Sequence, residues 1–265
     1  MRAVERGGCK KGEIPMGRLF GTDGVRGVAG EDMTCELAMD IGRAAATVLT
    51  YGRRRRPLVV LGKDTRLSSD MLGAALSAGL CSVGADVIDL GVVPTPAVAY
   101  LVGKYKADAG VMISASHNPY QFNGIKIFGG EGFKLPDALE DQIEALVLDE
   151  AAIPLVGGDR LGQITYSTTA VRDYVEHLKA TVPYSLDGMK VAVDCANGSA
   201  SATARLLFEE LGADAVLLSE TPDGVNINTN CGSTHIEALQ AYVKEHPDVV
   251  AGVAFDGDAD RCLFV

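Results

Sequence analysis

Two stretches of the chain alternate in the order strand, helix, strand, and this alternation restricts the fold more than any other feature. In the first stretch an apolar run with a polar loop, a small-residue helix and a second apolar run follow one another at residues 57–66, 68–84 and 85–91. Residues 189–218 repeat the order, and the tripeptide GAD occurs in both stretches. Because such units form parallel sheets, the pattern predicts two related α/β domains, although any two strand–helix–strand units look alike.

The segment between the two stretches predicts a linker. Residues 153–164 (IPLVGGDRLGQI) contain one proline and three glycines, and residues 168–182 then have the spacing of a helix that opens the second domain. The chain ends on RCLFV, which has the pattern of a further strand without a turn or cap after it. We therefore expect this chain to be a fragment of a longer protein.

Charge and composition restrict the class of protein. A net charge of −11 and a pI of about 4.8 argue against a nucleic-acid binder, and the basic run at residues 53–56 fits the end of a helix better than a binding patch. The 47% hydrophobic composition is enough for a core, but no apolar run is long enough to span a bilayer. Six scattered cysteines without a CxxC motif predict reduced thiols in a cytoplasmic protein with no disulfide framework.

Three carboxylates alternate with small residues near the end of the sequence. Asp256, Asp258 and Asp260 follow the apolar run VVAGVAF, and carboxylates at this spacing repel one another in a partly buried loop. A divalent cation removes that repulsion, and all-oxygen ligation suits Mg²⁺. A calcium EF-hand would need Gly where Arg261 stands, and the haloacid-dehalogenase phosphatases need further residues downstream of such a loop. We expect a magnesium site here rather than an acidic surface turn.

A polar turn between two apolar runs, VMISASHNPYQFNGIKIF, contains a second set of reactive side chains. Pro119 restricts Asn118 to extended geometry, so the turn can present Ser116 to a cleft. His117 and Lys126 could supply proton transfer or charge. The sequence has no Ser-His-Asp arrangement and no GxSxG motif, so hydrolase chemistry is not indicated. Taken alone, SHNP would more simply be a turn with a capping serine.

Basic residues on glycine-rich turns complete the set. Arg26 follows the turn GTDG, while Lys63 and Arg66 lie in GKDTRLSS. An arginine on such a loop can contact phosphate, although most loop arginines are simply solvated. Neither segment matches a P-loop, and nucleotide binding has no support from the sequence. Serine, acidic loop and basic residues together predict a site that handles phosphate.

Six segments of the chain resemble the α-D-phosphohexomutase family in the same order. They are LFGTDGVRG, GKDTRLSS, GVVPTPAVAYL, ISASHNPYQFNGIKIFG, NINTNCGSTH and DGDADRC, and the resemblance extends from about Met16 to the end. GTDGVRG and NCGSTH are similar to the phosphoglucosamine mutase branch in particular. The resemblance implies mixed, mainly parallel sheets flanked by helices, as in domains 1 and 2 of that family.

The resemblance also implies roles for the reactive residues. Ser116 would be the phosphoserine, and its phosphate would bind one Mg²⁺ together with Asp256, Asp258 and Asp260. Lys126 is the implied general acid/base, and Arg26 matches an active-site arginine.

Five further residues complete the expected site. His117 is grouped with the catalytic residues, and Arg261, Asn118, Lys63 and Arg66 are expected to bind phosphate or substrate.

The implied reaction interconverts glucosamine 6-phosphate and glucosamine 1-phosphate through a bisphosphate, for UDP-N-acetylglucosamine and the bacterial cell wall. Glucosamine or glucose 1,6-bisphosphate would phosphorylate the serine. The expected alternatives are a phosphoglucomutase or phosphomannomutase, and a fragment that binds phosphosugars without turnover. No nucleic-acid or membrane partner is expected, and the oligomeric state stays open, with a homodimer as one option.

The expected domain organisation follows the same resemblance. Residues 1–15 would be an N-terminal extension, residues 16–153 the domain with the serine loop, and residues 154–265 the domain with the metal loop. The family has four domains, and the third and fourth, which hold the substrate, would be absent. We therefore expect this chain to be a poor mutase on its own.

Overall fold

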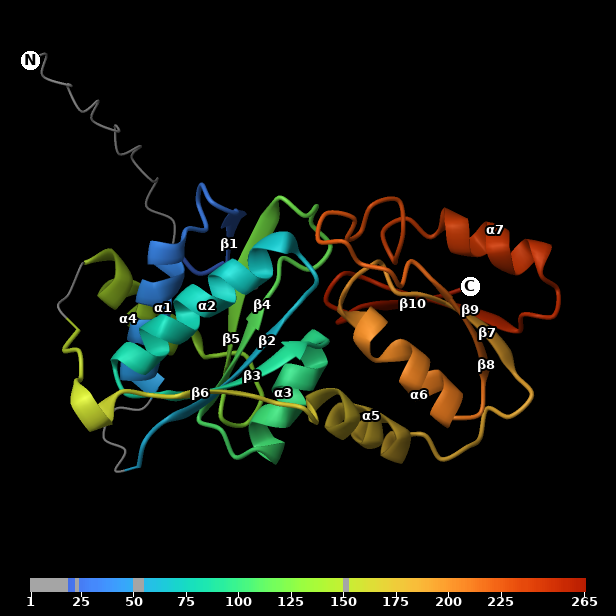
Figure 1. Cartoon of the computed structure of the whole chain (residues 1–265). Helices are drawn as coiled ribbons and strands as arrows, with labels where there is room; N and C mark the ends of the chain where they lie inside the picture. Colours follow the sequence, from blue (N-terminus) through green and yellow to red (C-terminus); the bar gives the residue numbers. More distant parts are fainter. Residues whose placement is uncertain (1–18, 22–23, 50–54, 150–152) are drawn as a thin grey trace, which may run out of the picture.

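The computed structural model describes residues 19–21, 24–49, 55–149 and 153–265, which form two α/β domains (Figure 1). The expected extension at residues 1–15, the centre of the GTDG turn and the first half of the basic run lie outside these residues. Among the described residues, no helix combines the length and the apolar character needed to cross a membrane.

The first domain contains a six-stranded mixed sheet in the order β1-β5-β4-β2-β3-β6. Four strands run parallel to one another, namely β2 (Leu58–Lys63), β3 (Asp86–Val92), β4 (Ala109–Ile113) and β6 (Ile164–Tyr166). Strand β5 (Phe122–Gly129) runs antiparallel to β4 and to β1 (Val25–Val28). Because β6 pairs with β3, residues 164–166 join the first sheet rather than the second. The expected boundary after residue 153 stays a prediction.

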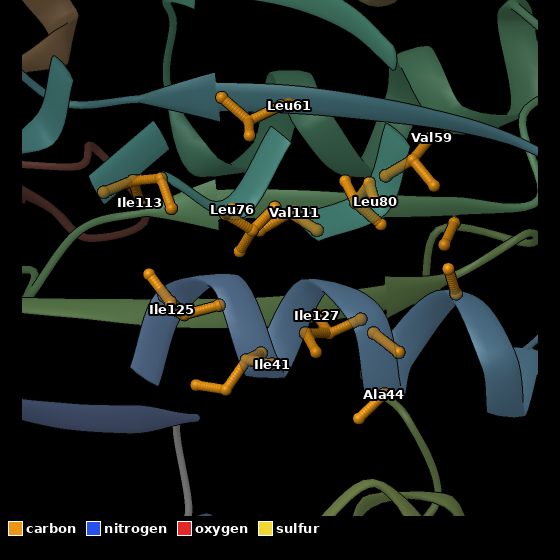
Figure 2. Close-up of a cluster of buried hydrophobic side chains, with 14 of the residues drawn as sticks. Ile41, Ala44, Val59, Leu61, Leu76, Leu80, Val111, Ile113, Ile125 and Ile127 are labelled. Carbon is orange, nitrogen blue, oxygen red and sulfur yellow. The ribbon is translucent and has the colours of Figure 1, made fainter. Parts of the chain in front are cut away.

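Helices cover both faces of this sheet, which explains why its central strands β2 and β4 are almost continuously apolar. Side chains alternate between faces along a strand, so Val59 and Leu61 enter one core cluster and Val60 the other. The first cluster packs the sheet against α1 (Cys35–Leu49), α2 (Leu67–Ser82) and α4 (Asp137–Leu148), and Figure 2 shows Ile41 and Leu76 among its side chains.

The other face of the first sheet packs against α3 (Thr95–Lys104) and α5 (Ala170–Thr181). Tyr100 of α3 stacks on His177 of α5 with ring centroids 3.8 Å apart, and Tyr174 is buried beside them. Helix α5 leads into the second domain, so this apolar contact helps to fix the two domains against each other (Figure 1).

The second domain has a four-stranded sheet in the order β10-β9-β7-β8. Strands β7 (Lys190–Asp194), β8 (Asp214–Leu218) and β9 (Ala251–Phe255) are parallel, and β10 (Cys262–Phe264) is antiparallel to β9. Helix α6 (Ala204–Glu210) packs on one face and α7 (Glu237–Glu245) on the other. Two short helices complete the chain, η1 (Gly158–Arg160) and η2 (Ser199–Ala202).

The two sheets share one arrangement, which confirms the prediction of two related α/β domains with mixed, mainly parallel sheets. The order β3-β2-β4-β5 in the first domain corresponds in order and strand direction to β8-β7-β9-β10 in the second. The serine turn connects β4 to β5, and the acidic loop connects β9 to β10. The two predicted functional loops therefore occupy equivalent positions, each at the carboxyl end of a parallel strand, where open α/β sheets bind ligands.

Candidate functional site

Ser116 lies in the turn after β4 with a backbone conformation that few side-chain-bearing residues adopt. Its φ of 54° is in the left-handed region, and the residue is 1% exposed. The Ser116 amide donates to Ser114 Oγ at 2.9 Å, and the Asn118 amide closes the turn on the Ala115 carbonyl. The left-handed region costs energy for serine, and these two local hydrogen bonds help to hold the turn in it.

The hydroxyl of Ser116 faces the acidic loop of the other domain. Ser116 Oγ donates a 2.6 Å hydrogen bond to Asp256 Oδ2, across 140 positions of sequence. The amide of Arg261 donates to the other oxygen of the same carboxylate, Asp256 Oδ1, at 3.2 Å. The turn after β4 and the turn after β9 thus meet at one hydrogen bond between a serine and an aspartate.

The three aspartates form a cluster that could hold a metal ion. One oxygen from each of Asp256, Asp258 and Asp260 lies within 4.8 Å of the others, and the first two residues are buried. Burial and the Asp258 carboxylate raise the pKa of Asp256 to about 6. Asp258 Oδ1 is buried and has no hydrogen-bond partner among the described residues. An all-oxygen set with mutual repulsion and one unsatisfied acceptor fits a hard divalent cation such as Mg²⁺.

Lys126 of β5 approaches the same cluster from the first domain. Its Nζ donates to Asp258 Oδ2 at 2.6 Å and to Asp260 Oδ2 at 3.5 Å. Thr95 Oγ1 also donates to Asp258 Oδ2, at 2.6 Å. Burial opposes ionisation of Asp258, but the Lys126 charge and these hydrogen bonds lower its pKa below the usual value. A pocket of about 140 Å³ lies beside Lys126, Thr95 and Asp260.

Arg26 and Arg261 place positive charge near His117, the residue that follows Ser116. Burial lowers the pKa of His117, and Arg261 and Arg26 lower it further, while Asp258 and Asp260 oppose the shift. Arg26 lies on β1 opposite Gly124 of β5. A Cβ on Gly124 would come within 2.9 Å of Arg26 Cγ, so the glycine leaves room for this side chain.

A second pocket, of about 440 Å³, lies between the serine turn and residues 227–235 of the second domain. His117, Pro119 and His235 are among the residues that line it.

Two basic residues expected to bind phosphate are engaged elsewhere. Arg66 is 2% exposed and lies beneath the serine turn, where its guanidinium donates to Pro119 O at 2.6 Å, Ser116 O at 2.8 Å and Asp64 Oδ2 at 2.8 Å. Lys63 pairs with Asp70 at 2.9 Å and with Asp89 at 3.5 Å. Each of the three guanidinium nitrogens of Arg66 donates to a protein oxygen, so Arg66 supports the turn from within, and the expected phosphate contact stays a prediction.

Sequence reasoning missed three residues that shape the site. Asp64 accepts hydrogen bonds from Arg66, Ser69 and Ser114, and Ser114 in turn receives the amide of Ser116. Thr95 binds Asp258 from the start of α3. The polar residues of KDTR directly after a buried strand were a usable signal for Asp64, whereas nothing local to the threonine indicates an aspartate 163 positions away.

Two family models match the chain. The phosphoglucomutase/phosphomannomutase alpha/beta/alpha domain I matches residues 17–153, and domain II of the same family matches residues 172–265.

Among curated relatives, a phosphoglucosamine mutase of Clostridium beijerinckii is 57% identical over 252 residues, and one of Acetivibrio thermocellus is 56% identical over 251 residues. Both alignments cover 94% of this chain but 56% of the relative, so the chain spans little more than half the length of these proteins.

Solved structures agree with the fold. A phosphoglucomutase/phosphomannomutase family protein from Burkholderia thailandensis has a TM-score of 0.80 at 29% identity, over 93% of this chain and 54% of that one. A putative phosphomannomutase from Thermus thermophilus has a TM-score of 0.79 at 30% identity, over 93% and 56%. Together with the family-model matches, these comparisons show that the chain belongs to the phosphoglucomutase/phosphomannomutase family.

Proposed function

We propose that this chain is the phosphoryl-carrying half of a phosphoglucosamine mutase. The observation that carries the proposal is the 2.6 Å hydrogen bond from Ser116 Oγ to Asp256, inside a cluster of three carboxylates. A serine hydroxyl held against a candidate cation site can carry a phosphoryl group, because the cation and nearby arginines offset the added negative charge. The identity of the branch rests on the phosphoglucosamine mutases that are 57% and 56% identical to this chain.

The aspartates supply the cation site of the proposal. Asp256, Asp258 and Asp260 would hold one Mg²⁺ together with the phosphate on Ser116. When bound, Mg²⁺ supplies charge neutralisation for phosphoryl transfer. Ser116 Oγ is already within hydrogen-bond distance of a carboxylate of that site, so little movement is needed for its phosphate to reach the same cation.

Lys126 is the candidate acid/base. In the forward direction the phosphoryl group passes from Ser116 to a hydroxyl of glucosamine 6-phosphate, and the proton of that hydroxyl leaves to a base. Lys126 Nζ lies at the edge of the 140 Å³ pocket and contacts Asp258 and Asp260, so it stands where a proton of the sugar hydroxyl could be exchanged. The bisphosphate formed then returns its other phosphoryl group to Ser116 and leaves glucosamine 1-phosphate.

The surrounding charges support anion binding. Arg26, Arg261 and His117 are proposed to act on the transferring phosphate, since both arginines influence the imidazole of His117 beside Ser116. Asn118 is proposed to stabilise the turn through the hydrogen bond that its backbone N–H donates to the Ala115 carbonyl. Arg66 and Lys63 are proposed to stabilise the fold rather than to bind substrate, because Arg66 donates to the Ser116 carbonyl and Lys63 pairs with Asp70.

The proposal extends to a longer protein of which this chain is a part. We propose that residues 16–153 and 154–265 are domains 1 and 2 of a cytoplasmic enzyme, that the sugar-holding domains lie outside this chain, and that this chain alone turns over poorly. Glucosamine or glucose 1,6-bisphosphate would load Ser116. A homodimer remains an open prediction. The alternatives are a phosphoglucomutase or phosphomannomutase, and a phosphosugar-binding fragment without turnover.

Relative rates on the full-length protein test the substrate. With Mg²⁺ and a bisphosphate activator present, conversion of glucosamine 6-phosphate, glucose 6-phosphate and mannose 6-phosphate is measured under identical conditions. The proposal predicts the highest kcat/KM for glucosamine 6-phosphate. A higher kcat/KM for glucose or mannose 6-phosphate would assign the chain to another branch of the family. Normal turnover by the 265-residue chain alone would contradict the proposed division of the site.

A further inference from the structure

The backbone carbonyl of Ser116 accepts hydrogen bonds from both domains at once. From the first domain, Arg66 Nη2 donates to Ser116 O at 2.8 Å. From the second domain, Asn228 Nδ2 donates to the same oxygen at 2.9 Å and to Asn118 O at 3.2 Å. The amide of Asn228 therefore bridges two carbonyls of the serine turn, and it does so from a loop 112 positions away in sequence.

The backbone conformation of Asn228 suits this contact. Its φ is 58°, a left-handed conformation that asparagine tolerates better than most residues, and its own amide donates to Ala196 O at 2.9 Å. The residue is 6% exposed. A Cβ on Gly257 would come within 2.6 Å of Ser116 O and 2.8 Å of Asn228 Nδ2, so the acidic loop closes tightly over the same contact.

The geometry points to Asn228 as a positioning residue for phosphoryl transfer. Ser116 Oγ keeps its place against Asp256 only while the backbone of the turn keeps the φ of 54°, and hydrogen bonds to the carbonyl help to hold that backbone. Arg66 fixes the carbonyl relative to the first domain, and Asn228 fixes it relative to the domain that carries the aspartates. Asn228 thus ties the position of the serine to that of the metal loop. Its effect on transfer rests on the proposed function, whereas its effect on the turn does not.

Glycine substitutions at two asparagines of the same loop separate this role from general loss of structure. Asn228→Gly removes the donor and keeps access to the left-handed conformation. Asn230→Gly is the matched control, because Asn230 also has a positive φ, of 53°, but is exposed. Asn228→Asp is a second variant that keeps the size of the side chain and, when ionised, has no hydrogen to donate. Thermal unfolding of all variants defines a temperature at which each is folded.

The first readout is hydrogen exchange of the peptide that contains Ser116, measured by mass spectrometry on the metal-free chain. We expect faster exchange of this turn in Asn228→Gly and Asn228→Asp, with Asn230→Gly the same as wild type. Unchanged exchange in both Asn228 variants, or equal acceleration in the control, would overturn the proposed tie between the domains. This measurement needs no phosphoryl transfer, so it stays decisive if the proposed function fails.

The second readout is the rate at which glucose 1,6-bisphosphate phosphorylates Ser116 in the presence of Mg²⁺. At saturating bisphosphate we expect Asn228→Gly to be slowed by roughly 10-fold or more, since small displacements of a reacting atom cost rate steeply. Mg²⁺ affinity, measured by calorimetry, is expected to match wild type because the aspartates are untouched. A rate within about twofold of wild type, or a parallel loss of Mg²⁺ affinity, would overturn the positioning role. A wild-type chain that accepts no phosphoryl group would count against the proposed function instead.

Discussion

Replacing Asp256 with asparagine should stabilise the metal-free protein and remove its response to Mg²⁺. The carboxylate of Asp256 is buried beside Asp258, and these two causes raise its pKa to about 6 from 3.8. Asparagine has nearly the same shape. Its Oδ1 can still accept from the Arg261 amide, and its Nδ2 can donate to Ser116 Oγ, so both hydrogen bonds of the carboxylate can be replaced.

The sign and size of the effect follow from proton linkage. Between pH 3.8 and about 6 the folded state of wild type binds more protons at Asp256 than the unfolded state, so its stability falls as pH rises through this window. Above about pH 6 the folded wild type carries the full free-energy cost of ionising the buried Asp256 carboxylate. Two pH units correspond to roughly 3 kcal/mol, which is an upper bound for the gain in the free energy of unfolding of Asp256→Asn at neutral pH. Well below pH 3.8 the difference should vanish, because the wild-type carboxyl is then protonated in both states.

Chemical denaturation with and without Mg²⁺ measures this prediction. In chelator at pH 7.5, Asp256→Asn should unfold at higher denaturant than wild type. At a Mg²⁺ concentration of about 100 times the dissociation constant, wild type should gain about 2.7 kcal/mol and the variant little or nothing. The advantage of the variant should then largely disappear. Asp187→Asn, which changes an exposed aspartate of the same domain, is the control for loss of one charge. Lower stability of Asp256→Asn in chelator, or equal Mg²⁺ stabilisation of both proteins, would contradict the proposed carboxylate repulsion and cation site.

Three other substitutions test neighbouring contacts. Lys126→Ala should raise the pKa of Asp258, which loses its closest cation, and should slow phosphorylation of Ser116. An unchanged phosphorylation rate would show that Lys126 takes no part in the reaction. Arg66→Met should cost about 3–5 kcal/mol in denaturant unfolding, because it leaves a buried carboxylate without its partner, and a loss below about 1 kcal/mol would contradict the buried pair. Gly257→Ala should slow phosphorylation of Ser116, because its Cβ would lie 2.6 Å from Ser116 O, and a wild-type rate would show that the two loops can separate freely.

The place of each functional loop at the end of a strand could be predicted from the sequence, because it depends on local pattern. Apolar runs of strand length that end in polar turns identify β4 and β9, and the carboxyl ends of parallel strands are where ligands bind. Ser116 and Asp256 each follow such a strand. The chemistry of three alternating carboxylates then indicated a cation, and the structure places their oxygens within 4.8 Å of one another.

The supports of the loops could not be predicted in the same way. Arg66 looks like any arginine on a polar turn, and only the packing of the turn over it shows that the side chain is 2% exposed. Asn228 and Thr95 depend on how the two domains meet, through contacts 112 and 163 positions apart in sequence. Periodicity and turn signals describe one element at a time, so they do not contain this information.

Phosphorylation of Ser116 is the most direct test of the account. Wild type and Ser116→Ala are incubated with glucose 1,6-bisphosphate, with Mg²⁺ or with chelator, and then analysed by intact mass and peptide mapping. We expect one added phosphoryl group, on the peptide that contains Ser116, in wild type with Mg²⁺, and none in Ser116→Ala or in chelator. A wild-type chain that stays unmodified under these conditions, or that gains phosphate at another residue, would contradict the claim that this serine is the phosphoryl carrier.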